Sequence, residues 1–171
     1  MTFKAKLVSL KIQGFGGDTK SNFVFDLAKR SKSDFVFLQE TPAARPAAIE
    51  VLHAKWRGKS FWSPTLGKEG GVVILVSEHT NFELSQWMRD SSGRAVGVLA
   101  LLGDQRYNFV NIYAPKNPTE WQVFFDSLPD YFFPNSIRIV AGDFNCIESV
   151  KLTVDKLSAL GLTLLKRSVL G

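Results

Sequence analysis

The chain has 171 residues, of which 45% are hydrophobic and 22% are charged, and its formal net charge is +5. This length fits one domain, and the composition is that of an ordinary globular protein, which excludes a disordered chain and a fibrous repeat. The excess of Lys and Arg permits a polyanionic partner such as nucleic acid without requiring one, and the single cysteine, Cys146, excludes an internal disulfide framework.

Strand and helix patterns alternate in the first part of the chain. Apolar and polar residues alternate over Lys6–Gln13, which predicts a strand, and the glycines that follow break it. A helix is then expected from about Asp18 to Ser31. Phe35–Leu38 is a short apolar run typical of a strand covered on both faces, and Pro46–Trp56 has the pattern of a second helix that begins with proline.

Strands dominate the middle of the chain and helices return towards its end. The predicted strands are Ser60–Trp62, Val72–Val76, Ala95–Leu102, Tyr107–Tyr113 and Ile137–Ala141, with Gly103-Asp104-Gln105 as a hairpin turn. A helix is expected to begin at Pro118 or Thr119, and another to cover Lys151–Leu160. The order of elements predicts an α/β fold in which two packed sheets carry helices on the outside.

Four polar side chains at or just after the ends of apolar strands are candidates for chemistry. Glu40 and Asp143 offer the hard oxygen ligands that Mg²⁺ prefers. Tyr113 could donate to a phosphoryl oxygen, and Asn145 could orient a water molecule. Ordinary structural roles remain open for each: a helix cap for Glu40, an Asx turn for Asp143 and Asn145, and a half-buried core position for Tyr113.

Basic residues near these strand ends could contact phosphates. The candidates are Lys11, Lys20, Arg94 and Lys116. A solvated surface is the alternative for each lysine. The four tryptophans are expected in the core, and Cys146 is expected to be a small buried residue.

The ordered motifs SLKIQGF, FVFLQET, GGVVILVSE, GRAVGV, FVNIYAPKNP and IRIVAGDFNCI resemble the endonuclease/exonuclease/phosphatase family. The resemblance covers residues 5 to about 162 and is strongest to the N-terminal endonuclease domain of LINE-type retrotransposons. It implies a four-layer αββα sandwich, the DNase I-like fold, and Mg²⁺-dependent hydrolysis of DNA phosphodiesters. It also implies that Glu40 is the metal ligand, that Tyr113 contacts the scissile phosphate, and that Asp143 and Asn145 position the water and the transition state. Arg94 matches a Gly-Arg step of the family.

The chain also departs from the family pattern. Gln13 stands where the family has an asparagine, and Lys11 stands where many LINE domains have another. The Ser-Asp-His element of the family's last third, which acts on the nucleophilic water, does not occur in these 171 residues. Residues 1–171 are therefore predicted to form one domain that is incomplete at its C-terminal third, with an unpaired sheet edge through which it self-associates.

We accordingly expect a LINE-type endonuclease domain by ancestry, a hydrolase whose activity is weakened or lost, with weak or absent Mg²⁺ binding. Lys11 is expected to pair with Glu40 and partly replace the metal; the alternative is a lysine free in solvent. A truncated pseudoenzyme with weak nucleic-acid binding is the competing function, and a phosphomonoesterase or phospholipid-headgroup hydrolase is a more distant one. The N-terminal Lys4 and Lys6 argue against a signal peptide and no apolar run could span a bilayer, so an intracellular location is expected, nuclear if the chain acts on DNA.

Overall fold

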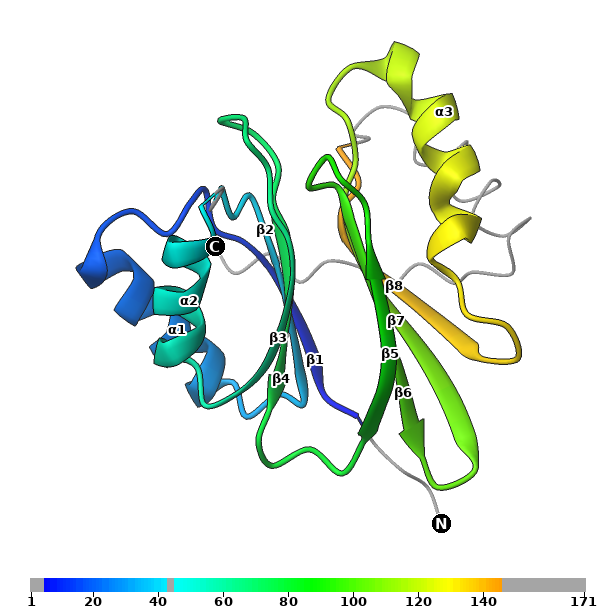
Figure 1. Ribbon diagram of the computed structural model, residues 1–171, viewed down its shortest axis with the longest axis horizontal. Helices are drawn as coiled ribbons and strands as arrows, with labels where there is room; N and C mark the ends of the chain where they lie inside the picture. The colour runs from blue at the N-terminus through cyan, green and yellow to red at the C-terminus, as the bar shows by residue number, and fades with distance from the viewer. Residues whose placement is uncertain (1–4, 43–44, 146–171) are drawn as a thin grey trace.

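Two four-stranded β-sheets face each other in the computed structural model, which describes residues 5–42 and 45–145 (Figure 1). The first sheet has the strand order β1-β2-β4-β3 and the second has the order β5-β6-β7-β8. The strands are β1 (Leu7–Lys11), β2 (Phe35–Gln39), β3 (Gly58–Ser63), β4 (Val72–Ser77), β5 (Glu83–Arg89), β6 (Ala95–Leu102), β7 (Gln105–Tyr113) and β8 (Ile137–Asp143).

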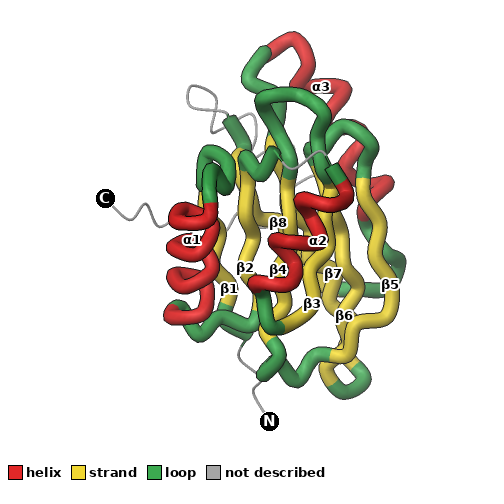
Figure 2. Tube along the Cα trace, turned by 60° about the vertical axis from the view of Figure 1, so that its left-hand side comes forward, coloured by secondary structure: helices red, strands yellow, loops and turns green. Residues whose placement is uncertain are grey.

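Helices cover the outer face of each sheet. The helices α1 (Asp18–Arg30) and α2 (Pro46–Lys55) lie against the first sheet, and α3 (Pro118–Ser127) lies against the second, as Figures 1 and 2 show. A short 3₁₀ turn, η1 (Leu128–Tyr131), follows α3. The four-layer αββα sandwich expected from the sequence is therefore confirmed for the described residues. Among these residues, no helix is long and apolar enough to cross a membrane.

The core consists of three apolar layers, one between the sheets, one under α1 and α2, and one under α3. Between the sheets, aromatic side chains stack, and the rings of Phe35 and Phe109 have centroids 3.9 Å apart. Under α1 and α2, Phe25 packs against Trp56 on the outer face of the first sheet. Because β2 and β4 lie inside one sheet and are covered on both faces, all their residues are buried, which explains their continuous apolar runs.

Strand register brings four strand ends to the same end of the sandwich. The strands β1 and β2 are parallel, with Lys11 opposite Gln39. The strands β7 and β8 are also parallel, with Tyr113 opposite Asp143. The residues that end these four strands, and Glu40 directly after β2, therefore lie together at one end. This end, drawn uppermost in Figure 1, is called the site end below.

Some sequence predictions are wrong in detail. The strand β5 was not predicted, because it is a largely exposed edge strand with a polar composition. The first strand ends at Lys11 rather than Gln13, whose φ of 54° leaves the extended region. Trp87 is 47% exposed rather than buried, whereas Trp56 and Trp62 are in the core as expected. The predicted helix over Lys151–Leu160 and Cys146 lie outside the described residues.

Candidate active site

A lysine ion-paired with two carboxylates lies at the site end. The Lys11 Nζ atom is 3.2 Å from Glu40 Oε1 and 2.9 Å from Asp143 Oδ2. The side chains of Lys11, Glu40 and Asp143 are only 25%, 15% and 11% exposed, so water screens these ion pairs poorly. Burial acts to lower the pKa of Lys11, but the hydrogen bonds and charges of Asp143 and Glu40 outweigh burial and raise that pKa. Lys11 is therefore a charged ammonium at neutral pH, and its expected contact with Glu40 is present.

Tyr113 lies against the same carboxylate. Its ring is fully buried, and its hydroxyl donates a hydrogen bond of 2.8 Å to Glu40 Oε1. Burial and this hydrogen bond both raise the pKa of Tyr113. The phenol is therefore a neutral hydrogen-bond donor at neutral pH, and it holds Glu40 from the side of the second sheet.

The loop after β8 contains the Asx turn that the sequence left open. The backbone N–H of Asn145 donates to Asp143 Oδ1 at 3.1 Å. The Asn145 side-chain amide donates to the carbonyl oxygen of Ala114 at 2.6 Å, so it joins this loop to the end of β7. The alternative of a helix cap for Glu40 is wrong, because the N-cap of α2 is Arg45 and no side chain caps it.

Gln13 does not join the ion-paired group. It lies beyond the end of β1 with an exposed side chain, and its backbone carbonyl accepts a hydrogen bond of 2.9 Å from Lys20 Nζ. The alternation that would place Gln13 on the same side as Lys11 ends with the strand. Lys20 is thereby placed at the loop between β1 and α1.

Arg94 and Lys116 lie at the site end with partners of their own. The Arg94 Nη1 atom donates to the carbonyl oxygen of Tyr113 at 3.3 Å, and the guanidinium lies 5.7 Å from the centre of the Tyr113 ring. Lys116 forms an exposed ion pair of 2.7 Å with Glu69. Contact of Lys11, Arg94 and Lys116 with nucleic acid stays a prediction.

A buried amide network that the sequence analysis missed joins the two sheets beneath these residues. The Asn111 amide donates to the carbonyl oxygens of Leu38 and Val73 at 2.9 and 2.8 Å, and its oxygen accepts from Gln39 Nε2 at 2.8 Å. Gln39 precedes Glu40, and Asn111 lies two residues before Tyr113. The network therefore fixes the relative position of the two strand ends that carry Glu40 and Tyr113. The available signal was a polar residue within the apolar run FVNIY.

Asp90 organises the turn that carries Arg94, and the sequence analysis missed it too. Its Oδ1 accepts from Ser63 Oγ and from the backbone N–H groups of Arg94 and Ala95 at 2.5, 2.9 and 3.0 Å, and its Oδ2 accepts from Ser92. Burial acts to raise the pKa of Asp90, but these hydrogen bonds outweigh it and hold the pKa below its usual value. A carboxylate thus fixes the backbone that presents Arg94 to Tyr113.

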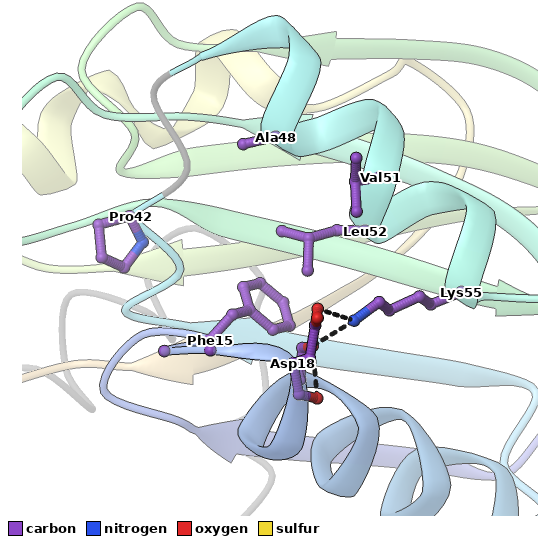
Figure 3. A pocket seen from close by; sticks show the side chains of 10 residues that line it. Phe15, Asp18, Pro42, Ala48, Val51, Leu52 and Lys55 are labelled. Carbon is purple, nitrogen blue, oxygen red and sulfur yellow. Dashed lines mark hydrogen bonds and ion pairs between the residues drawn. The ribbon is translucent and has the colours of Figure 1, made fainter.

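A cavity of ≈ 440 Å³ lies between α1 and α2 (Figure 3). Apolar side chains such as Phe15 and Leu52 line it, together with Asp18 and Lys55, which form an ion pair of 2.8 Å. None of the predicted site residues lines this cavity. The two charged side chains of its lining, Asp18 and Lys55, are paired with each other.

The residues at the site end do not fit a divalent metal in the arrangement observed. Mg²⁺ requires about six oxygen ligands at ~2.0–2.1 Å in near-octahedral geometry. Among the described residues, no group of three or more His, Cys, Asp or Glu side chains is placed to hold a metal ion. The two carboxylates that are close together, Glu40 and Asp143, already contact the ammonium of Lys11.

Comparisons with known proteins point to the same fold. No family model matches the chain. The transposon TX1 uncharacterized 149 kDa protein of Xenopus laevis is 30% identical over 112 residues, which are 64% of this chain and 8% of that protein. The endonuclease domain of TRAS1, a telomere-specific non-LTR retrotransposon, superposes with a TM-score of 0.67 at 14% identity over 96% of this chain and 76% of that domain.

A second solved structure is similar at the level of the fold. TDP2 from Caenorhabditis elegans superposes with a TM-score of 0.60 at 19% identity, over 84% of this chain and 48% of that chain. The chain thus spans about half the length of that TDP2 and a small part of the transposon protein. The chain has the DNase I-like fold that these two solved structures share, as its sequence motifs indicated.

Proposed function

We propose that the chain is a LINE-type endonuclease domain that contacts DNA at the site end and has weak or no phosphodiester hydrolase activity. The observation that carries this proposal is the convergence of Glu40, Tyr113, Asp143 and Asn145 at one end of a DNase I-like sandwich. The similarity to a transposon protein and to the TRAS1 endonuclease domain supports the retrotransposon origin.

DNA contact is supported by the cations and donors at this end. Arg94 and Lys116 flank Tyr113 and Glu40, and the chain as a whole carries a net charge of +5. The ion pair of Lys116 with Glu69 is exposed, so a phosphate can compete for the ammonium at little cost. One solved structure with this fold, TDP2 from D. rerio, is a complex with a single-strand DNA product. We expect binding that is independent of sequence and falls steeply with salt.

Weak hydrolysis is expected because Glu40 and Asp143 already contact Lys11, and Glu40 also accepts a hydrogen bond from Tyr113. Lys11 neutralises part of the negative charge of Glu40 and Asp143, and carboxylate oxygens that already contact an ammonium are less available to a metal ion. The Tyr113 hydroxyl must leave Glu40 before it can donate to a phosphoryl oxygen. The ion pairs of Lys11 with Glu40 and Asp143 also favour the second candidate function, a non-catalytic domain that binds nucleic acid.

Two assays on the same protein test the proposal. Fluorescence anisotropy with a labelled duplex should show binding at low salt that weakens in Arg94→Ala and Lys116→Ala. Nicking of supercoiled plasmid in Mg²⁺ should stay near the background level. The absence of DNA binding at low salt would contradict the proposal.

Matched variants decide between a weak enzyme and a non-catalytic domain. Residual nicking by a weak enzyme should disappear in Asp143→Asn. It should persist in Asp18→Asn, which removes an ion-paired carboxylate on the outer side of the first sheet. Nicking that neither variant changes would come from a contaminant, and the non-catalytic function would then stand.

A further inference from the structure

We propose that Lys11 is a built-in cation: its ammonium occupies the position between Glu40 and Asp143 that a divalent metal would need, so the chain excludes metal there until Lys11 is removed. This inference deepens the proposed function, because it names the cation that balances the charge of the same site.

The position of Lys11 makes it a bridge between the sheets. Lys11 and Glu40 come from the first sheet, at the ends of β1 and β2, while Asp143 ends β8 of the second sheet. The ammonium therefore lies between carboxylates that tertiary folding has brought together, 3.2 Å from one and 2.9 Å from the other. A cation is held here from two sides.

The carboxylate oxygens have few other partners. Asp143 Oδ2 is buried and, among the residues that the structure describes, has no hydrogen-bond partner of good geometry, so the ion pair with Lys11 compensates its charge. Glu40 Oε1 accepts from the Tyr113 hydroxyl at 2.8 Å in addition to its contact with Lys11. The Lys11 ammonium also lies 5.7 Å from the centre of the Tyr113 ring, whose face attracts cations.

Charge balance explains why ammonium and metal compete. Two carboxylates and one ammonium leave a net charge of −1, whereas the two carboxylates alone would place −2 in a mostly buried site. Like charges at short distance in a poorly hydrated site are unfavourable, so removal of the ammonium should strongly favour the binding of another cation. A divalent ion would balance the two negative charges and would bind the same carboxylate oxygens of Glu40 and Asp143.

The test is a calorimetric titration of Mn²⁺ into the purified chain and three variants. Wild type should give little heat at the site, while Lys11→Met, which keeps the length and loses the charge, should bind Mn²⁺ on the order of tenfold or more tightly. Lys11→Arg keeps a cation and should behave like wild type. Lys55→Met removes an ammonium of similar exposure that is paired with Asp18 instead, away from the site end, and it should also behave like wild type.

A double variant locates any gained site. Mn²⁺ binding gained in Lys11→Met should disappear in Lys11→Met/Asp143→Asn if Asp143 holds the metal. Tight Mn²⁺ binding by wild type that Asp143→Asn abolishes would overturn the proposal, and so would unchanged Mn²⁺ affinity in a folded Lys11→Met.

A measurement on wild type covers the case in which Lys11→Met fails to fold. The ¹⁵N signal of the Lys11 ammonium should remain in place when Mg²⁺ is added to millimolar concentration, because the metal does not displace it. A shift of this signal with saturation would contradict the proposal. Neither measurement uses DNA, so a failure here is distinct from a failure of DNA binding.

Discussion

Replacement of Asn111 by alanine should destabilise the fold strongly, because this side chain joins the two sheets. Asn111 is fully buried and makes three hydrogen bonds, to Gln39 and to the carbonyl oxygens of Leu38 and Val73. Each such bond contributes about 1 kcal/mol net, and the space left by the amide adds a further cost, so we expect a loss of about 3–4 kcal/mol. In the variant, Gln39 Nε2 loses Asn111 as an acceptor but keeps its hydrogen bond of 3.0 Å to Ser9 Oγ, which limits the cost of that loss.

Urea unfolding of the chain measures this loss directly. The Asn111→Ala variant should unfold at a lower urea concentration with an unchanged slope, because the surface exposed on unfolding is nearly the same. Gln105→Ala is the control, since Gln105 is exposed and its side chain donates to the neighbouring Arg106 carbonyl. The stability of this variant should stay within about 0.5 kcal/mol of wild type. A loss below about 1 kcal/mol in Asn111→Ala would refute the role of the network in joining the sheets.

Three further predictions concern the turn, the loop and the sheet edge. Asp90→Ala should reduce the free energy of unfolding at neutral pH. Because folding lowers the pKa of Asp90, the difference from wild type should shrink as the pH falls below the ordinary aspartate pKa towards the folded pKa. A difference in urea unfolding that stays constant down to strongly acidic pH would contradict this. Gly71→Ala should cost about 2 kcal/mol or more in the same assay, since its φ is 79° and a Cβ would lie 2.4 Å from the Thr41 carbonyl oxygen. Gly103→Ala, at φ 61° with open space around it, should cost clearly less, and equal losses would show that the close approach is unimportant. Ile137 is 48% exposed on β8, an edge strand of the second sheet within the described residues, so Ile137→Lys should reduce self-association in sedimentation velocity, whereas a monomeric wild type would refute that prediction.

The sequence predicted the layers of the fold and the gathering of the site residues. Buried strands produce continuous apolar runs that are easily recognised, and the ordered motifs LQET, IYAP and GDFN contain Glu40, Tyr113 and Asp143, which the structure brings to one end. The sequence predicted that Lys11 pairs with Glu40. The structure shows that the Lys11 ammonium also pairs with Asp143.

Other features lay beyond sequence patterns for physical reasons. The strand β5 pairs at a sheet edge and is largely exposed, so it lacks the apolar signal that marks interior strands. The contact of Gln39 with Asn111 joins residues 72 positions apart, and the Asp90 turn depends on Ser63 from another strand. Such polar partners are set by tertiary packing, which local spacing does not encode.

Nucleic-acid contact at the site end is the central proposal, and NMR mapping with a short DNA duplex tests it most directly. The opposite end also carries cations, since Lys29 and Arg57 line a cavity of ≈ 350 Å³ there, so charge alone does not decide the location. We predict that backbone amide signals of Lys11, Glu40 and the loops carrying Arg94 and Lys116 shift on addition of DNA at low salt and return as salt is raised. Shifts confined to the end with Lys29, Arg57 and His79 would contradict DNA contact at the site end.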